Sequence, residues 1–273
     1  MTTDSQTDTT SPRTPLTYAS YLRVDELLAL QTPLSDGPEH DETLFIIIHQ
    51  VYELWFKQIL HEVDRLDASL DADDVPVALV ALKRVLTIFK TLVGQVDILE
   101  TMSPLSFNSF RTRLDSSSGF QSVQFRTLEF RLGARSRGRL GVHPEGSAVR
   151  STLEALLTTE STYDRFLRFM DRAGFSMPPE LATRERGGGN FEHDGARRQL
   201  VTVYRTRPDL AQVCERLVDL DEGLQEWRYR HVKMVERTIG MKSGTGGSSG
   251  AEYLRATLFR PLFPDLWAIR NEF

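Results

Sequence analysis

A histidine lies inside a long predicted helix near the start of the chain. Residues 42–66 contain no Gly or Pro, and their apolar side chains recur at helical spacing, so a helix is expected there. His49 falls at the edge of the apolar stripe, one turn after Phe45, whereas His61 falls in the polar stripe and is expected to be solvated. Taken alone, this helix favours a core histidine satisfied by a hydrogen bond.

A second histidine occupies the same kind of position, which strengthens the case for a functional site. A helix is expected over residues 209–239, and His231 lies in the middle of its inward-facing apolar line, while Asp221 and Arg228 fall on other faces. A buried imidazole must find a hydrogen bond or a metal. Two such histidines suggest a haem or metal site in a helical bundle, beside the alternative of two core histidines.

The motifs that the sequence lacks argue against several kinds of metal site. No His-Glu-x-x-His helix or cysteine cluster supports zinc, and no paired Glu-x-x-His motifs support a di-iron centre. Without a Cys-x-x-Cys-His motif, any haem would be held non-covalently.

A loop of small residues follows the second helix. Residues 241–250 read MKSGTGGSSG, which suits a flexible linker. Consecutive small residues also let backbone N–H groups converge on a carboxylate or phosphate. No Gly-Lys-Ser/Thr follows and no strand precedes, so the loop is not a nucleotide-binding P-loop, and an amino-acid carboxylate fits it better.

The elements that must position these groups are all expected to be helical, because sustained period-two alternation and internal repeats are absent. The fold class is therefore all-α, a helical bundle. The loops at 135–146 and 184–195 are expected to be solvated, with His193 exposed. Besides the two helices above, helices are expected at 18–30, at 77–100, from Ser103-Pro104 to a break at 115–119, at 120–132, in two pieces over 149–173, and at 196–206. An apolar segment over 253–267 is expected to dock on the bundle.

The composition is that of a globular protein, with 273 residues, 40% hydrophobic and 26% charged. A net charge of −5 gives no reason to expect nucleic acid or an anionic membrane as partner. The polar residues 1–14 suit a disordered tail rather than a signal peptide, ahead of a single domain over 15–273. With one cysteine, Cys214, and no apolar run long enough to cross a bilayer, a cytoplasmic protein is expected.

Six short segments between Leu16 and Trp267 share their order and spacing with one enzyme family. They are LTYASYL (16–22), PLSD with HDETLFIIIHQ (33–50), ELWFK (53–57), SSGFQS (117–122), WRYRHV (227–232) and GTGGSSG (244–250). Together they resemble the tryptophan 2,3-dioxygenase family of haem enzymes over nearly the whole chain. The resemblance implies ferrous haem b bound between core helices and a reaction of L-tryptophan with O2 that cleaves the indole C2–C3 bond to give N-formyl-L-kynurenine.

The resemblance also implies roles for individual residues. His231 would be the proximal ligand of the haem iron, and His49 would be the catalytic residue on the distal side, facing the indole N–H. Arg111 resembles the family's arginine for the substrate carboxylate, a task that suits a guanidinium fork. The other implied contacts are Phe45 and Phe107 along the indole pocket, Thr245 at the amino-acid end of the substrate, Ser118 near the haem, and Tyr18 and Tyr21 reaching a neighbouring subunit's site in a homotetramer.

Two positions depart from the family's common pattern. Val51-Tyr52 stands where many members have Thr-Ser, and Phe107 stands where many bacterial members have Tyr. These departures leave room for a sibling haem oxygenase of secondary metabolism, which would act on a substituted tryptophan such as β-methyltryptophan and insert one oxygen to give a 2-oxindole. A haem sensor or a helical interaction protein without turnover is a further alternative, but it would need neither Arg111 nor the glycine loop.

Overall fold

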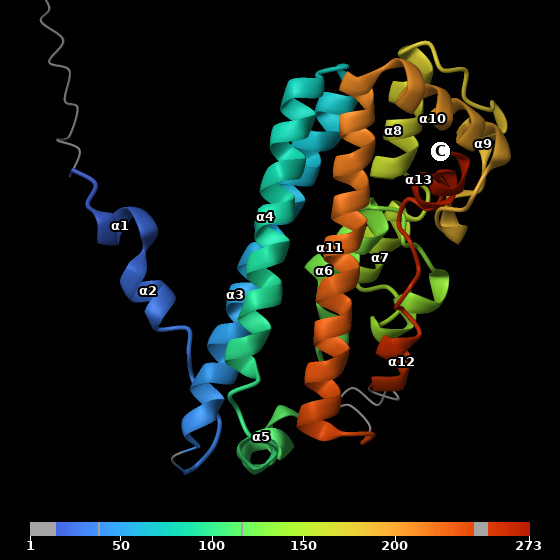
Figure 1. The fold of residues 1–273 in the computed structure, drawn as a ribbon. Coiled ribbons are helices and arrows are strands. Elements are labelled where there is room, and N and C mark those ends of the chain that lie inside the picture. Colours follow the sequence, from blue (N-terminus) through green and yellow to red (C-terminus); the bar gives the residue numbers. More distant parts are fainter. Residues whose placement is uncertain (1–14, 38, 116, 243–250) are drawn as a thin grey trace, which may run out of the picture.

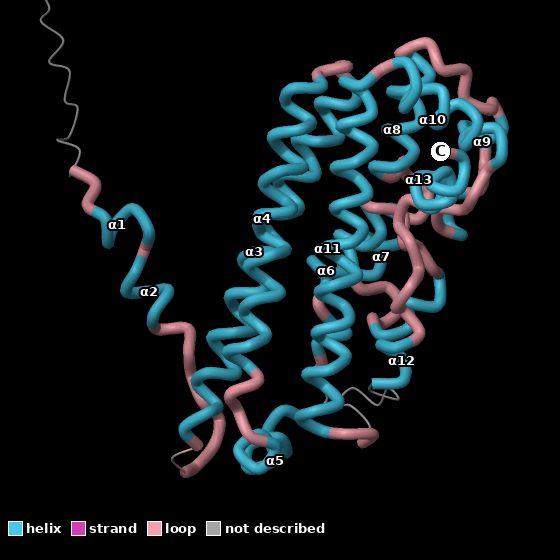
Figure 2. Tube along the Cα trace, in the orientation of Figure 1, coloured by secondary structure: helices cyan, strands magenta, loops and turns pink. Residues whose placement is uncertain are grey.

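The computed structural model describes residues 15–37, 39–115, 117–242 and 251–273, which form α-helices, short 3-10 helices and loops, with no strand among them (Figure 2). The all-α prediction is confirmed. The α-helices are α1 (Tyr18–Leu22), α2 (Val24–Leu28), α3 (His40–Asp71), α4 (Val75–Leu99), α5 (Pro104–Arg111), α6 (Val123–Arg131), α7 (Ala148–Leu156), α8 (Thr162–Arg172), α9 (Glu180–Thr183), α10 (Asp194–Thr206), α11 (Pro208–Ile239), α12 (Ala251–Arg255) and α13 (Pro264–Ala268).

Three long helices form the frame of the molecule, with α3 and α11 both packed along α4 (Figure 1). α3 extends beyond the expected range because nothing in its sequence interrupts it before Asp73, which has a φ of 57°. The side chain of Asp74 then caps α4 by accepting from the backbone N–H of Val77 at 3.1 Å, with proline in the first turn as expected. α11 ends at Gly240, whose φ of 63° suits glycine.

The buried apolar side chains gather mainly into two clusters that matter for the site. The larger one joins α3, α4, α8, α10, α11 and the C-terminal segment, and it holds the upper part of the bundle together. The smaller one closes the lower end, where α5 meets α3 and α4. The fully or nearly buried members of the smaller cluster are Ile48, Leu99, Met102, Phe107 and Phe110.

The N-terminal helix expected over residues 18–30 is in fact two short helices. The chain breaks at Arg23, which adopts a left-handed conformation with a φ of 52° and ends α1. Neither α1 nor α2 buries a residue, and together they form an arm that extends away from the bundle (Figure 1).

The helix expected over 120–132 also begins later. A 3-10 helix (Gly119–Gln121) comes first, and the side chain of Ser122 then caps α6 by accepting from the backbone N–H of Phe125 at 3.2 Å. The caps at Ser118 and Ser122 therefore divide a segment that the sequence pattern predicts as one continuous helix.

The two loops expected to be solvated are exposed at many positions, as predicted, but a few of their side chains pack or form hydrogen bonds inside the molecule. Arg135 is buried and its guanidinium donates to the carbonyls of Phe130, at 2.9 Å, and Thr159, at 2.6 Å, while His143 is buried as well. His193 is only partly exposed, since its backbone N–H donates to the buried carboxylate of Asp265 at 2.6 Å and its ring contacts Glu180. At Arg135 and His193 the polar composition gave the wrong prediction, because these residues pair with helix-end carbonyls and a buried carboxylate.

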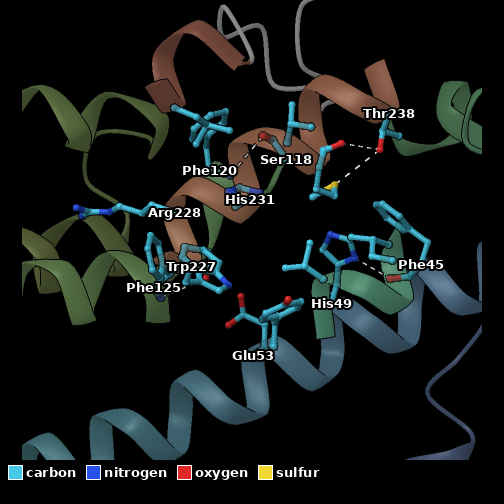
Figure 3. Close-up of a pocket in the computed structure, with 18 of the residues that line it drawn as sticks. Phe45, His49, Glu53, Ser118, Phe120, Phe125, Trp227, Arg228, His231 and Thr238 are labelled. Carbon is cyan, nitrogen blue, oxygen red and sulfur yellow. Dashed lines mark hydrogen bonds between the residues drawn. The ribbon is translucent and has the colours of Figure 1, made fainter. Parts of the chain in front are cut away.

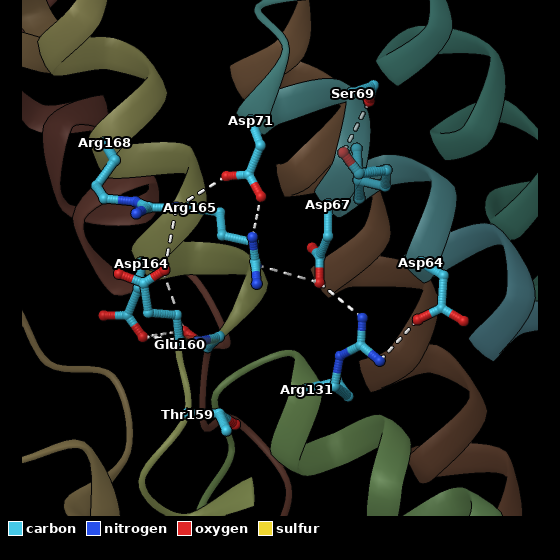
Figure 4. Close-up of polar contacts among 12 residues, drawn as sticks. Asp64, Asp67, Ser69, Asp71, Arg131, Thr159, Glu160, Asp164, Arg165 and Arg168 are labelled. Carbon is cyan, nitrogen blue, oxygen red and sulfur yellow. Dashed lines mark hydrogen bonds and ion pairs between the residues drawn. The ribbon is translucent and has the colours of Figure 1, made fainter.

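Charged side chains join α3, α6 and α8 on one side of the bundle (Figure 4). The buried Asp67 of α3 accepts from Arg131 of α6 at 2.7 Å and lies 3.7 Å from Arg165 of α8. Arg131 also reaches the exposed Asp64 at 2.8 Å, and Arg165 pairs with Asp71. These contacts fix α6, which carries one wall of the pocket described below, against α3.

A buried carboxylate on α11 anchors the C-terminal segment. Asp221 was expected on a polar face, but it is fully buried and accepts from the backbone N–H groups of Leu262, at 2.7 Å, and Phe263, and from the indole N–H of Trp267 at 2.9 Å. The apolar segment after the glycine loop therefore docks on α11, as expected. In the part of the chain described here, none of the helices has the length and apolar character needed to cross a membrane.

Candidate active site

A large cavity opens between α3, α5, α6, α11 and α12, and its empty space amounts to about 1650 Å³ with the open mouth included (Figure 3). Most of its wall is apolar, as in sites for cofactors and small molecules. Charged groups reach it from α3, α5, α6 and α11. The lining side chains used below are Phe45, His49, Tyr52, Glu53, Phe107, Arg111, Ser118, Phe125, Arg126, Glu129, Trp227, Arg228, His231 and Thr238.

His231 projects from the C-terminal third of α11 into this cavity, as its position in the apolar line predicted. The indole of Trp227, one turn earlier, stacks on its ring with centroids 5.2 Å apart and planes 17° apart. Burial, assisted by the nearby His49, lowers the pKa of His231 to about 4. The imidazole is therefore neutral at pH 7, and within the described chain neither ring nitrogen has a hydrogen-bond partner.

His49 enters the same cavity from α3. Its Nδ1 lies 2.7 Å from the carbonyl oxygen of Phe45, so Nδ1 carries the proton and donates, which leaves Nε2 as an acceptor. Burial lowers the pKa of His49 below its usual value, against the hydrogen bond to Phe45 and the charge of Glu53, which raise it. The phenyl ring of Phe45 holds the imidazole in place, with centroids 4.1 Å apart. By contrast, His61 on the same helix is exposed, as expected.

Tyr52, which belongs to one of the two departures from the family pattern, lines the cavity and is held by a hydrogen bond to α4. Its hydroxyl donates to the carbonyl oxygen of Leu92 on α4 at 2.8 Å, and burial raises its pKa to about 12. Its ring contacts Trp227 edge-on, at 6.3 Å between centroids. The tyrosine thus links α3 to α4 and supports the wall behind His231.

An aromatic wall and a guanidinium lie at the lower end of the cavity. The ring of Phe45 contacts Phe107, with centroids 5.7 Å apart, and Phe110, at 5.6 Å. Phe107 and Arg111 are four residues apart on α5, so both face the cavity, Arg111 from the last turn. Ser103 fixes the start of this helix by accepting from the backbone N–H of Ser106 at 3.0 Å.

The cavity brings together most of the residues singled out in the sequence. Six of them line it from four parts of the chain: Phe45, His49, Phe107, Arg111, Ser118 and His231. Tyr18 and Tyr21 do not, because they lie on the N-terminal arm, 79% and 72% exposed. Thr245 falls outside the residues that the structure describes.

Four charged residues of the wall were not identified from the sequence. Glu53 faces the cavity one turn after His49, and its carboxylate accepts from Gln124 at 2.9 Å. Arg126 and Glu129 of α6 and Arg228 of α11 are buried side by side. The Arg-x-x-Glu spacing of α6 is a sequence signal for the first pair, but a helical wheel places Arg228 on a solvent face.

The donor set of the cavity fits a haem. No three His, Cys, Asp or Glu side chains of the described residues come together as ligands for a metal ion, so no all-protein metal site forms around His231. A porphyrin supplies four nitrogens of its own and needs one neutral axial imidazole, which the low pKa of His231 provides. The apolar walls suit a macrocycle, and His49 leaves a polar contact on the facing helix.

Comparison with known proteins gives one consistent match. The family model described as tryptophan 2,3-dioxygenase matches residues 3–171 and 181–272. A tryptophan 2,3-dioxygenase of Herpetosiphon aurantiacus is 56% identical over 257 residues, which cover 94% of this chain and 98% of that protein. One from Anaeromyxobacter sp. (strain K) is 53% identical, covering 97% and 99%, and one from Arthrobacter sp. (strain FB24) is 42% identical, covering 94% and 92%.

Proposed function

The chain belongs to the tryptophan 2,3-dioxygenase family, and from that premise we propose that it is a haem-dependent dioxygenase that converts L-tryptophan and O2 into N-formyl-L-kynurenine by cleaving the indole C2–C3 bond. The observation that carries the proposal is the pair of imidazoles, His49 and His231, which enter one apolar cavity from two different helices. Identities of 53–56% over nearly the whole length of named dioxygenases support the two-oxygen reaction.

His231 would hold the haem iron through its neutral ring, with Trp227 stacked on it to fix the orientation of the imidazole. Ser118 lines the same cavity and would lie beside the cofactor. Ferrous haem b, when bound, supplies the binding and activation of O2. The protein around it supplies orientation and the exclusion of water.

His49 positions the indole. Because its Nδ1–H is donated to the carbonyl of Phe45, the lone pair of Nε2 is free to accept a hydrogen bond from the indole N–H of tryptophan. The lowered pKa keeps the ring in this neutral form at pH 7. Phe45 and Phe107 pack along the indole and keep water away from the reacting bond.

Arg111 would bind the carboxylate of tryptophan through two parallel N–H donors at the mouth of the cavity. Phe107, one turn earlier, completes this end of the pocket. Thr245 would hold the amino-acid end of the substrate, and the glycine loop that carries it would close over bound substrate. This division of roles places the charged end of tryptophan at α5 and its indole between Phe45 and His49.

We also propose that residues 15–273 form one catalytic domain of a cytoplasmic homotetramer, with neither nucleic acid nor membrane as partner. The N-terminal arm supports an assembly, because it exposes apolar side chains that a neighbouring subunit would cover. Its tyrosines, Tyr18 and Tyr21, would reach the neighbour's pocket.

Product mass tests the reaction. Reduced, haem-loaded protein is given L-tryptophan and isotopically labelled O2, and both labelled atoms are expected in the product. One labelled atom in a 2-oxindole would instead establish the one-oxygen reaction of the sibling enzyme. No structural observation favours that sibling, since the hydroxyl of Tyr52 is held by α4.

A further inference from the structure

One glutamine of α3 attaches the base of the N-terminal arm to the bundle. Gln50 accepts from the side-chain amide of Gln31 at 2.5 Å, and its own amide nitrogen donates to the carbonyl oxygen of Leu30 at 3.1 Å. Both ends of one primary amide are therefore engaged, which fixes its rotation and distinguishes its oxygen from its nitrogen. Residues 30 and 31 are held to α3 by this two-point contact.

The contact continues into α2. The amide of Gln31 also donates to the carbonyl oxygen of Leu27 at 3.1 Å, in the last turn of α2. α2 leads back into α1, the helix that carries the two exposed tyrosines. In the described part of the chain, the backbone of residues 15–31 makes no hydrogen bond to the backbone of the bundle. The direction of the arm therefore depends on side chains, and Gln50 supplies the contact nearest to α2.

A buried carboxylate of α3 holds the connection between α2 and α3 at a second place. Glu42, 2% exposed, accepts from the backbone N–H groups of Leu34, at 2.7 Å, and Ser35, at 3.2 Å. Gln50 and Glu42 are about two turns apart on α3, so the connection is attached at two points along one helix. Such attachment sets the angle of the arm before a partner binds it, which lowers the entropic cost of docking.

Two consecutive residues of α3 serve different sides of this helix. His49 lines the cavity, whereas Gln50 does not line it and contacts the base of the arm instead. Consecutive side chains leave a helix about 100° apart. A substitution at Gln50 can therefore change the arm without entering the pocket of its own subunit.

We propose that Gln50 orients the N-terminal arm toward a neighbouring subunit, because it holds Leu30 and Gln31 against α3. This inference rests on the proposed function, since it takes Tyr18 and Tyr21 as residues that complete a neighbour's pocket. The partner is a second copy of this chain, which the arm would meet where it extends away from its own bundle (Figure 1). Gln50 is a positioning residue, since it acts on the neighbour's pocket only through the arm.

Mixed oligomers of two defective full-length chains test this role. The first chain carries Tyr18→Ala and Tyr21→Ala and supplies a haem-loaded pocket, while the second carries His231→Ala and supplies only its arm. Different affinity tags on the two chains allow mixed oligomers to be purified, and their activity is divided by haem content. Gln50→Leu in the second chain should lower the restored activity about fivefold or more, because two hydrogen bonds at the base of the arm are lost. Gln50→Leu in the first chain should leave it within about twofold.

A second glutamine of the same helix gives the matched control. Gln58 donates within α3, to Glu62 at 2.8 Å, so Gln58→Leu in the second chain should leave the restored activity within about twofold. Gln31→Leu breaks the contact from the side of the arm, and it should match Gln50→Leu and add little to it in one chain. Gln31→Leu also takes the place of Gln50→Leu in the test if the latter variant does not fold.

The opposite pattern would overturn the assignment. If Gln50→Leu lowers activity in the first chain as much as in the second, Gln50 acts on the pocket of its own subunit. If it lowers activity in neither chain, the contact with Gln31 does not orient the arm. If the second chain restores no activity even with Gln50 intact, the arm does not serve a neighbour, and this inference fails with the proposed assembly. Haem-loaded unmodified protein that leaves L-tryptophan unchanged would instead refute the proposed function.

Discussion

At the scale of single residues, His49 and His231 are both kept neutral by burial, but they differ in their hydrogen bonding. Burial dominates for both, but His49 alone has its Nδ1 proton committed to a backbone carbonyl. That contact selects the tautomer, and the tautomer decides that Nε2 accepts rather than donates. The same helix that buries the ring therefore also sets its hydrogen-bonding role.

The pH dependence of turnover should report this tautomer. The folded pKa of His49 lies below 6.5, so the acceptor is fully present above that pH and is lost as pH falls through the folded pKa. We expect kcat/KM to fall on the acid side with a midpoint below 6.5. The other titratable groups that line this end of the cavity are Glu53, Arg111 and the neutral His231.

The control for this pH profile is on the same helix. His61→Ala removes an exposed imidazole and should leave the profile unchanged, whereas His49→Ala should lower kcat/KM and remove the acid limb. An acid limb that persists in His49→Ala would assign the titration to another group.

Replacing Arg111 should weaken substrate binding. Arg111→Ala is expected to raise KM for L-tryptophan by a free-energy equivalent of about 2 kcal/mol, because the carboxylate loses a bidentate charged partner. Arg113→Ala is the control, since this arginine is two residues away, pairs with Asp36 at 2.9 Å and lies outside the cavity. If KM is unchanged in Arg111→Ala, the carboxylate binds elsewhere.

The residues that could be predicted from sequence are those whose local pattern is unusual. His231 interrupts an apolar line, so its position alone indicates a site. Arg228 could not be found in this way, because a charged residue beside an apolar stripe normally reaches solvent. Its burial depends on Glu129, 99 residues earlier, which only the packing of α6 on α11 brings within 2.7 Å.

At the scale of elements, the long helices follow from periodicity, whereas the breaks between short ones do not. The starts of α4 and α5 and the end of α11 were predictable because Asp74, Ser103 and Gly240 are ordinary cap residues. The break between α1 and α2 was missed because arginine rarely adopts the left-handed conformation seen at Arg23. Local sequence contains no signal for such a residue.

The contribution of the ion pairs between α6 and α3 can be tested at Arg131, which pairs with the buried Asp67 and the exposed Asp64. Arg131→Met removes the hydrogen-bonded partner of the buried Asp67 and is expected to cost about 3 kcal/mol of unfolding free energy. Asp64→Ala removes the exposed partner of the same arginine and should cost about 0.5 kcal/mol or less. Urea unfolding of the two variants measures the difference, and equal losses would mean that burial of Asp67 does not matter.

At the scale of the whole molecule, the N-terminal arm is the part that does not pack into the helical bundle. It buries none of its own helical residues, yet it carries exposed apolar side chains next to exposed tyrosines. On the proposed assembly, a second copy of the chain would cover these apolar side chains, which the described part of the bundle leaves exposed. In that arrangement each pocket would be completed by the arm of another subunit.

Complementation between two defective chains tests this arrangement. A chain lacking residues 1–22 should keep its haem, because α1 buries nothing, but it should lose activity with Tyr18 and Tyr21. A full-length His231→Ala chain keeps the arm but should hold no haem. Each chain alone is expected to be inactive, while co-expression should restore part of the activity, since the arm of the second chain can complete the haem-loaded pocket of the first. Full activity of the truncated chain, or mixed oligomers without activity, would show that the arm does not serve a neighbour's site.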